Sequence, residues 1–366
     1  MAPVEIASER LPADRDAVDE TWLASTLAPH PEFQSDPIVS ASFSALGDGL
    51  GQMSEMLVAH AQLASGAELP LVIKLHTTVE DMRNLAIRYH HYLRETNFYQ
   101  KLAHAVPVRT PHIYAAAYDQ DIRRTALVME HVGDTHYSPD QLAGATLAEV
   151  ELAIDRLAQL TAAFWDSPLR ATHTWMGNAN SDFYRSSLTD YPDSIEETLR
   201  RFGDAIPGLE GVARRIGARL GEIHDYLCEG VQALTHWDYR VENMFFNRTD
   251  PDDFVLLDWQ LMMWMRPGWD FVYLVGTCVD QALRQQHFDA LIDRYVEGLA
   301  ANGVTGYGRT DFEQDLRMAA MACTIVPIVG GAGYDLANER SAALFRTIGE
   351  RIFSTVEDLD SLSLLR

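Results

Sequence analysis

The chain has 366 residues, which is more than one typical hydrophobic core supports, so we expect two domains or two lobes. With 47% hydrophobic and 22% charged residues, it has the composition of a soluble globular protein. Its net charge of -24 disfavours binding to nucleic-acid phosphates and to anionic membranes, so we predict neither as a partner.

The first third of the chain alternates between strand-like and helix-like patterns. In chain order, the expected elements are an amphipathic helix at 13–28, two β-like runs within 41–64, a strand at 69–76, a helix at 81–103 and a strand at 123–132. Together they predict an N-terminal helical extension over residues 1–37 and a small mixed lobe over residues 38–131.

The remainder, residues 132–366, is expected to be a mainly helical lobe. The clearest segments are helices at 147–165, 211–229, 288–300 and 312–322, with two short strands near 233–237 and 254–259. No internal repeat or low-complexity tract interrupts them.

Cysteine usage and the N-terminus point to the cytoplasm. The three cysteines lie far apart and form neither a metal motif nor a disulfide framework, so we expect buried thiols in a reducing compartment: Cys228, Cys278 and Cys323. The charged N-terminus has no apolar core of a signal peptide. The uncharged run at 318–333 is too short for a membrane helix and contains proline and glycine.

The stretch LTHWDYRVENMFFNRTDPDDFVLLDWQ (234–260) carries the strongest chemical signal. Asp238, four residues and then Asn243 follow the spacing of the catalytic loop in phosphoryl transfer, where the Asp takes a proton and the Asn holds a metal. Asp258 ends an apolar run, and hard oxygen ligands of this kind suit Mg²⁺. The spacing alone also arises by chance in surface loops, but Asp258 favours a site.

Two upstream features support the same chemistry. Lys74 lies inside the apolar run LVIKL, where a lysine is costly unless it is paired, and Glu95 on the next helical segment is the expected partner. Each alone is compatible with a solvated charge. The loop GDGLGQMSE (47–55) has the glycines of a phosphate-covering loop, although it matches neither GxGxxG nor the Walker pattern, so we exclude a P-loop fold.

In these motifs and in their order, the chain resembles the aminoglycoside phosphotransferase and choline kinase-like family, and in particular its ecdysteroid kinase-like branch. The resemblance covers about residues 40–340 and rests on LVIKL, RETNFYQKL, LVMEHV, LAQLTAAFWDSP, HWDYRVEN, LLDWQ and GWDFVYLVG. It implies an α+β, two-lobed protein-kinase-like fold with a small β-rich N-lobe that binds nucleotide and a larger helical C-lobe.

The resemblance also implies roles for individual residues. Asp238 matches the catalytic base, Asn243 and Asp258 the Mg²⁺ ligands, and Lys74 with Glu95 the pair that holds the phosphates. Nucleotide contacts are further implied for the loop glycines and for a hinge whose backbone pairs with adenine: Gly47, Gly49, Gly51, Met129, Glu130, His131 and Val132. Asp270 matches a residue that braces the catalytic loop, and His236 is expected to brace the same loop.

The chain departs from the family pattern in two places. Trp237 stands where the family has glycine, so its ring either shapes the acceptor pocket or only packs. The metal Asp lies in DWQ instead of DFG, and no APE-like activation segment follows, which favours a small-molecule acceptor. Arg240 is compatible either with phosphate binding or with a salt bridge to a carboxylate. The histidines at 90, 91, 131 and 136 match no metal signature.

The sequence therefore predicts an ATP- and Mg²⁺-dependent phosphotransferase that acts on a hydroxyl of a small molecule, aminoglycoside-like or another alcohol. One alternative is a nucleotide-binding pseudokinase or regulatory protein without turnover. Another is a metal-dependent hydrolase, which leaves Lys74 and the glycine loop unexplained. Neither the acceptor nor the oligomeric state can be read from the residues.

Overall fold

The structure, a computed structural model, describes residues 3–46, 53–181, 185–333 and 338–365. Contacts within the chain divide it into two compact units. The first unit comprises Met1–His136 and Val255–Leu261, and the second comprises Tyr137–Phe254 and Met262–Arg366. The DWQ segment therefore belongs to the first unit although it follows the catalytic-loop motif in the sequence. The functional roles assigned to the two lobes stay predictions.

The first unit is built on a six-stranded sheet with the order β1-β5-β6-β4-β3-β2. The short β1 runs parallel to β5, and the other neighbours are antiparallel. The strands are β1 Val4–Glu5, β2 Ile38–Ala45, β3 Ser54–Leu63, β4 Glu68–His76, β5 Ile113–Asp119 and β6 Arg124–Glu130. Strand β5 is an element that the sequence patterns did not indicate.

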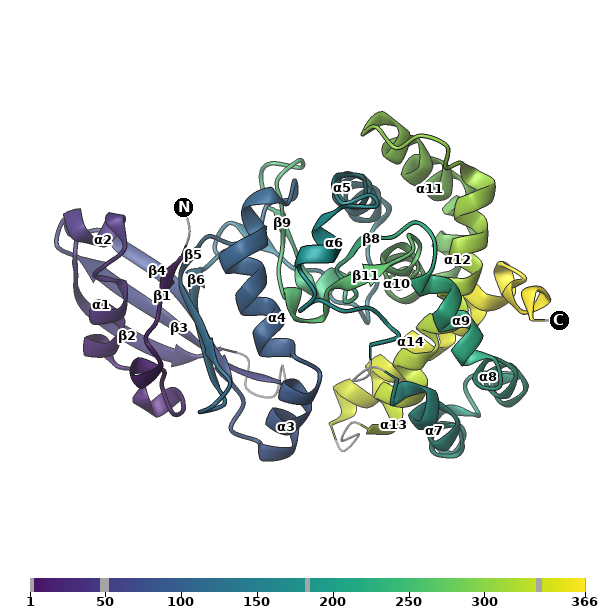
Figure 1. Ribbon diagram of the computed structural model, residues 1–366, viewed down its shortest axis with the longest axis horizontal. Coiled ribbons are helices and arrows are strands. Elements are labelled where there is room, and N and C mark those ends of the chain that lie inside the picture. Colours follow the sequence, from purple (N-terminus) through teal and green to yellow (C-terminus); the bar gives the residue numbers. More distant parts are fainter. Residues whose placement is uncertain (1–2, 47–52, 182–184, 334–337, 366) are drawn as a thin grey trace. The chain divides into compact units, whose positions relative to one another are not determined.

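Alternation along β4 separates the core of the first unit from its polar face. Leu71, Ile73 and Leu75 are fully buried in one hydrophobic cluster, and the helix α1 (Glu20–Leu27) contributes Leu23 and Leu27 to that cluster. Successive strand residues point to opposite faces, so Lys74 points away from this core. Figure 1 shows α1 on one side of the sheet and α4 (His91–Asn97) on the other.

Local capping explains where the helices of the first unit differ from the expected ranges. The helix expected from residue 13 begins at Glu20, because the Asp19 side chain accepts a hydrogen bond from the Trp22 N–H at 2.7 Å. The single helix expected over 81–103 is divided at His90, whose φ of 59° ends one helix before the next begins. The pieces are α3 Glu80–Arg88, α4 and a π-helical turn at Phe98–Leu102; the short α2 spans Pro31–Ser35.

The second unit is mainly helical. Its helices are α5 Leu147–Ala163, α6 Leu169–Thr172, α7 Ser187–Phe202, α8 Leu209–Gly217, α9 Leu220–Cys228, α10 Trp269–Cys278, α11 Gln281–Ala301, α12 Arg309–Cys323, α13 Gly331–Gly333 and α14 Glu339–Asp358. Its strands β8 Ala233–Thr235 and β11 Met263–Met265 pair antiparallel. A third short strand of this unit is β9 Met244–Asn247, and the strands β7 His136–Tyr137 and β10 Phe254–Leu256 each span a boundary between the two units.

Helix α10 forms the centre of the second unit. All ten of its residues are buried, and it packs against α5, α12 and α14. Helix α5 starts where the sequence places it, because Thr146 and Glu149 form a reciprocal capping box. The one helix expected over 211–229 is instead the pair α8 and α9, and the amphipathic α7 was not expected at all.

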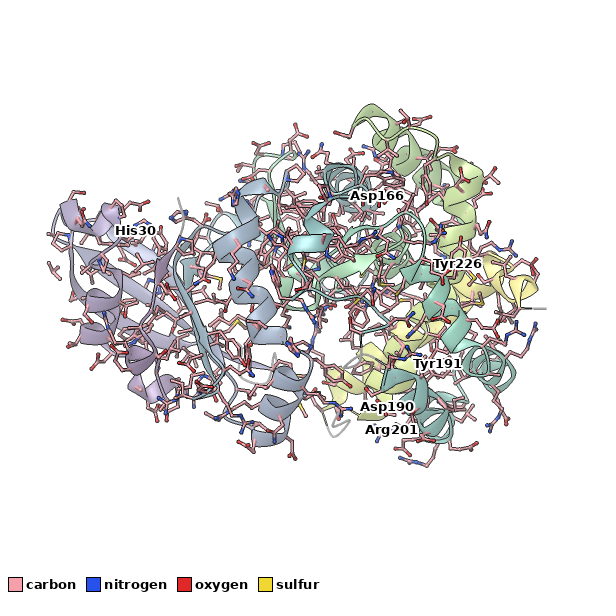
Figure 2. All side chains as sticks on the ribbon, in the orientation of Figure 1. His30, Asp166, Asp190, Tyr191, Arg201 and Tyr226 are labelled. Carbon is pink, nitrogen blue, oxygen red and sulfur yellow. The ribbon has the colours of Figure 1, made fainter. Side chains whose placement is uncertain are left out.

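Two tyrosine hydroxyls of the second unit are hydrogen-bonded to polar side chains of other segments of the chain. The Tyr191 hydroxyl lies 2.8 Å from that of Thr324, and Tyr226 donates to Asp315 at 2.7 Å. Figure 2 labels the two tyrosines, Tyr191 and Tyr226. The segment Arg309–Gly333 has the length and hydropathy of a membrane span, and 56% of its apolar window is buried inside the protein. Core helices of soluble proteins pass the same test of length and composition.

Candidate active site

Three charged side chains from distant parts of the sequence meet in the first unit. The Lys74 Nζ donates to Glu95 Oε1 at 2.8 Å and to Asp258 Oδ1 at 2.9 Å. The Lys74 side chain is 11% exposed and that of Glu95 4%, whereas that of Asp258 keeps 24% of its surface. The expected partnership of Lys74 with Glu95 is thus present in the geometry, and Asp258 joins it.

The charges of this cluster explain its ionisation. Burial alone would lower the pKa of Lys74, but the carboxylates of Asp258 and Glu95 outweigh it and hold that pKa well above its ordinary value. Burial raises the pKa of Glu95 to about 7, although the positive charge of Lys74 opposes the rise. The negative charge of Asp258 adds to it, because the two carboxylates share one ammonium. Lys74 is therefore a permanent cation at neutral pH, next to a carboxylate that is partly open to solvent.

The segment that carries Asp258 is held by α4 and the turn after it. The buried Arg94 donates to the Gln260 carbonyl at 3.0 Å, and the Trp259 ring stacks on Phe98 at a centroid distance of 4.0 Å. Asp258 itself has a φ of 66°, a left-handed conformation that non-glycine residues rarely adopt. Arg94 and Phe98 are four residues apart, a spacing that places both on one side of this helical segment and that could have indicated their shared role.

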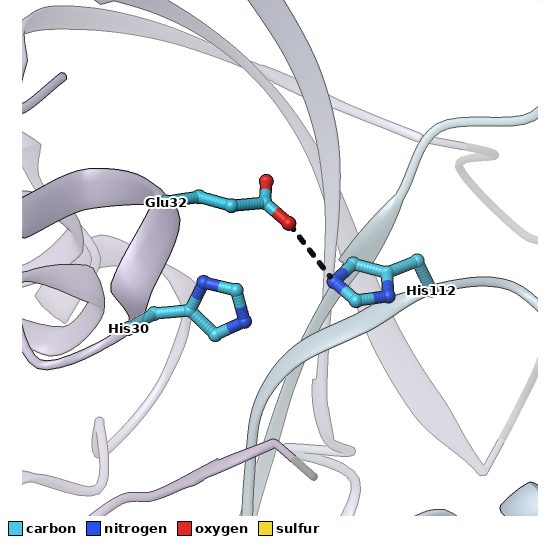
Figure 3. Close-up of side chains that lie close together, drawn as sticks. All are labelled: His30, Glu32 and His112. Carbon is cyan, nitrogen blue, oxygen red and sulfur yellow. Dashed lines mark ion pairs between the residues drawn. The ribbon is translucent and has the colours of Figure 1, made fainter. Parts of the chain in front are cut away.

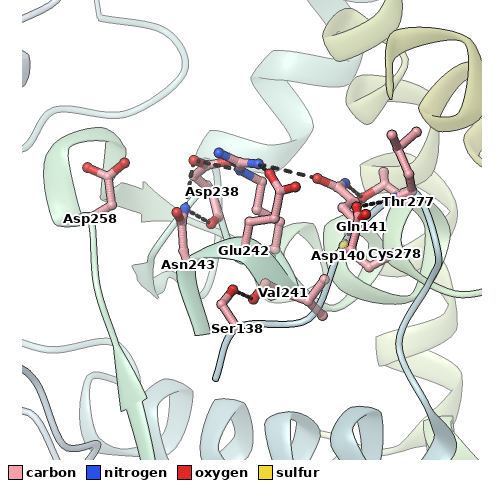
Figure 4. A network of polar contacts seen from close by, with 12 residues as sticks. Ser138, Asp140, Gln141, Asp238, Val241, Glu242, Asn243, Asp258, Thr277 and Cys278 are labelled. Atoms are coloured by element: carbon pink, nitrogen blue, oxygen red, sulfur yellow. Dashed lines mark hydrogen bonds and ion pairs between the residues drawn. The ribbon is translucent and has the colours of Figure 1, made fainter. Parts of the chain in front are cut away.

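The catalytic-loop motif in the second unit forms a compact hydrogen-bonded turn (Figure 4). Asn243 Nδ2 donates to Asp238 Oδ2 at 2.8 Å and to the Asp238 carbonyl at 2.9 Å. Arg240 Nε lies 3.2 Å from Asp238 Oδ1, and its guanidinium also pairs with Glu242. Of the two roles considered for Arg240, phosphate binding and a salt bridge, the structure shows the salt bridge to carboxylates.

The neighbours of Asp238 keep it ionised. Burial would raise the pKa of this carboxyl, but the charges of Arg240 and His236 and hydrogen bonds from Asn243 and Tyr273 lower it below its ordinary value. Tyr273 was not expected from the sequence. It lies one helical turn after Asp270 on α10, and that spacing is the signal that could have indicated it.

Asp270 at the start of α10 braces the loop through backbone contacts. Its carboxylate accepts the His236 N–H at 2.7 Å and the Trp237 N–H at 2.8 Å. Burial raises the pKa of Asp270 to about 7 against these two donors. The geometry agrees with the expected bracing role, and His236, which is fully buried, also fits a structural position.

Trp237 occupies a backbone position that favours glycine. Its φ is 71°, which explains why a residue without a Cβ suits this point of the loop. The Trp237 ring stacks on Trp269 with centroids 4.7 Å apart, and Trp269 Nε1 donates to the Trp237 carbonyl at 2.8 Å. Packing therefore accounts for the ring within the second unit, and the stacking offsets the backbone strain.

The remaining predicted nucleotide contacts fall in two places. Gly47, Gly49 and Gly51 lie outside the described residues. The hinge residues span the end of β6, with two in the strand and two just after it: Met129, Glu130, His131 and Val132. The Glu130 carboxylate accepts from Arg109 at 2.7 Å and from the His112 N–H at 3.0 Å, which fixes the strand end. Adenine recognition by this hinge stays a prediction.

The donor atoms in each unit are compatible with a hard divalent cation. The Asn243 amide nitrogen is engaged by Asp238, so its oxygen is the atom that remains for a metal. Asp258 accepts from Lys74 and Gln260, and each of its oxygens keeps a further lone pair. Carboxylate and amide oxygens are the ligands that Mg²⁺ prefers.

Comparison with known proteins finds one family whose profile covers most of the chain. The profile of a family described as ecdysteroid kinase-like matches residues 49–303. Among proteins with curated descriptions, none matches the chain significantly.

Several solved structures share the fold. A Ralstonia eutropha protein assigned to the aminoglycoside phosphotransferases is 15% identical, with 92% of this chain and 97% of that chain covered and a TM-score of 0.56. The GDP complex of aminoglycoside 2'-phosphotransferase-IIIa is 13% identical, with 92% and 100% covered and a TM-score of 0.54. An ethanolamine kinase from Plasmodium vivax is 10% identical, with 94% and 89% covered and a TM-score of 0.53.

At these identities the likeness shows the fold alone. It confirms the expected α+β, protein-kinase-like fold, with a sheet in the N-terminal part and helices in the C-terminal part.

Proposed function

Since the chain belongs to the ecdysteroid kinase-like family, we propose that it is an ATP- and Mg²⁺-dependent phosphotransferase that moves the γ-phosphoryl group to a hydroxyl of a small molecule. The observation that carries the proposal is the Lys74 ammonium between Glu95 and Asp258. A buried lysine with two carboxylate partners is a costly arrangement, and breaking such a cluster leaves an uncompensated charge. Binding of nucleotide phosphates by the Lys74 ammonium would account for this arrangement.

On the nucleotide side, Lys74 supplies a fixed positive charge for the phosphates, and Glu95 holds its side chain in place. Asp258, with Asn243, would hold Mg²⁺, which when bound neutralises charge that develops on the phosphate oxygens. Met129, Glu130, His131 and Val132 would meet the adenine through the backbone, and Gly47, Gly49 and Gly51 the phosphates.

On the acceptor side, Asp238 would accept the proton of the attacking hydroxyl. Its lowered pKa keeps it a carboxylate at neutral pH, so it is ready to orient and then deprotonate that hydroxyl. The hydroxyl oxygen forms a bond to the γ-phosphorus while the bond from that phosphorus to the β–γ bridging oxygen breaks, and ADP leaves with that oxygen. Asp270 keeps the loop that carries Asp238 in one conformation through its two backbone contacts.

The acceptor is proposed to be an aminoglycoside-like compound or another alcohol. The structures that share the fold include an aminoglycoside phosphotransferase and an ethanolamine kinase, whose acceptors carry amines. A net charge of -24 suits a cationic acceptor in the same way. We place this activity in the cytoplasm, where ATP is available.

A thermal-shift titration with ATP, GTP and Mg²⁺ tests the nucleotide site. Wild type, Asp258→Ala and the exposed control Asp252→Ala would be run together. We expect a Mg²⁺-dependent rise in Tm for wild type and Asp252→Ala, and none for Asp258→Ala. Absence of any shift in wild type would contradict the proposal.

ADP release with a panel of hydroxyl acceptors then tests turnover. Release that depends on one acceptor class supports the phosphotransferase. Nucleotide binding without release under any acceptor would instead favour a nucleotide-binding pseudokinase. Phosphate release from esters without nucleotide would favour a hydrolase.

A further inference from the structure

Two histidines and a glutamate converge in the first unit, away from Lys74 in the sequence and on different elements. His30 precedes α2, Glu32 lies in its first turn, and His112 immediately precedes β5. One ligand atom from each lies within 4.8 Å of the other two, and Figure 3 shows the three side chains directed toward one another. No other such group of ligating side chains occurs among the described residues.

His30 points to a ligand independently of this proximity. Its side chain is fully buried, and within the described chain neither its Nδ1 nor its Nε2 has a hydrogen-bond partner. Buried imidazole nitrogens normally have one, because an unpaired polar group loses its solvation without compensation. His112 Nε2 also lacks a hydrogen-bond partner in the described part of the chain, and the Glu32 carboxylate lies 3.8 Å from it.

We propose that His30, Glu32 and His112 bind a transition-metal ion of the Zn²⁺ class. Two imidazoles and one carboxylate are a donor set typical of zinc, with the fourth position open to water. Ligand atoms around one zinc lie about 3.3 Å apart, so the separations between the side-chain atoms need to close by up to about 1.5 Å. Glu32 is exposed and His112 is partly exposed, so both can make that movement.

The donor set also excludes the cation that phosphoryl transfer uses. Mg²⁺ prefers oxygen ligands and disfavours imidazole, whereas zinc, nickel and cobalt bind imidazole well. This second site is therefore independent of the proposed phosphotransfer and of its metal.

Metal binding here would connect the N-terminal segment to the central sheet. The backbone of His112 exchanges hydrogen bonds with Glu130, since Glu130 N donates to the His112 carbonyl at 2.8 Å and the Glu130 carboxylate accepts the His112 N–H at 3.0 Å. Zinc would thus fix residues 30–32 against the start of β5 and the end of β6. We expect its main effect to be on the stability of the first unit.

Zinc titration by calorimetry on the full chain, without nucleotide, tests the proposal. Wild type is compared with His112→Ala, Glu32→Gln and the control His60→Ala, which removes an exposed histidine from β3. We expect one zinc per chain in wild type and in the control. His112→Ala should lower the affinity at least about tenfold, and Glu32→Gln by less. Both variants change exposed or partly exposed side chains, so both should fold.

Two further measurements sharpen the result. Zinc should raise the Tm of wild type and of His60→Ala but not that of His112→Ala, and excess Mg²⁺ should not displace it. Bound Co²⁺ should give the visible absorption of a four-coordinate site. Failure of wild type to bind zinc, equal affinity in His112→Ala, or an equal loss in His60→Ala would each overturn the proposal.

Discussion

Two polar clusters, one around Lys74 and one around Asp238, are built in different ways. In the first unit, Lys74, Glu95 and Asp258 come from three distant segments and contact one another directly. In the second unit, Asp238 and Asn243 are neighbours in one short loop, and a single distant carboxylate, Asp270, braces that loop through its backbone. A cluster assembled from distant segments depends on the whole first unit, whereas the loop depends on its own turn and on one helix terminus.

This difference predicts which property of the protein each substitution should impair. Loss of a charge from the Lys74 cluster leaves buried charge uncompensated, so stability and nucleotide binding should fall together. Loss of the Asp238 carboxylate leaves the turn in place, so catalysis should fall while the fold remains. The following experiments test that separation.

Asp238→Asn is expected to have the largest effect. Removal of the proposed base should lower turnover by about 10²–10⁴-fold, because the hydroxyl loses its proton acceptor while the loop keeps its shape. Acceptor-dependent ADP release measures the rate, and calorimetry should find ATP affinity within about twofold of wild type. Turnover close to that of wild type would remove Asp238 from the base role.

Lys74→Met should combine loss of nucleotide binding with loss of stability. Burial of Glu95 without its partner costs about 3–5 kcal/mol, as measured by urea denaturation. The matched variant is Lys74→Met with Glu95→Gln, which removes the unpaired charge. It should regain much of the stability but none of the ATP affinity. Equal stability of the single and double variants would show that the cluster is not electrostatically coupled.

Asp270→Asn tests the brace. One acceptor for the backbone N–H groups of His236 and Trp237 is lost, so we expect about 1–3 kcal/mol of destabilisation and a fall in kcat without a change in ATP affinity. Asp252→Asn, a change at an exposed carboxylate, serves as a control. An unchanged kcat in Asp270→Asn would show that the loop holds its conformation unaided.

The same residue predicts a pH dependence. The folded-state pKa of Asp270 is raised to about 7 from its ordinary 3.8, so the folded protein retains this proton more strongly than the unfolded chain. The stability that this contributes is fully present below pH 4 and is lost as the pH rises toward 7. The Tm difference between wild type and Asp270→Asn should therefore change across that interval and level off above it.

Trp237→Gly should have the smallest effect. Glycine relieves a left-handed backbone worth about 1–2 kcal/mol but removes the stack on Trp269, worth about 0.5–1.5 kcal/mol. The net change in unfolding free energy should stay within about 1 kcal/mol. If acceptor KM changes while ATP affinity does not, the ring shapes the acceptor pocket as well as packing.

Local signals made much of the molecule predictable. The capping box at Thr146 and the spacing within HWDYRVEN act over a few residues, so α5 and the Asp238 turn follow from the sequence. The helix division at His90 could not be predicted, because nothing in the helical periodicity of 81–103 indicates a positive φ. Nor was α7 predicted, although it is amphipathic.

The sequence by itself predicted the α+β fold through the order of its family-like motifs, and the partnership of Lys74 with Glu95 because a lysine in an apolar strand needs a partner. The compact turn from Asp238 to Asn243 follows from spacing within one short motif. Only the tertiary structure decided that Asp258 joins Lys74, that Asp270 holds two N–H groups of the loop, and that His30 meets His112. These contacts join residues far apart in the chain, and packing of the sheet and helices, not local preference, brings their atoms within reach.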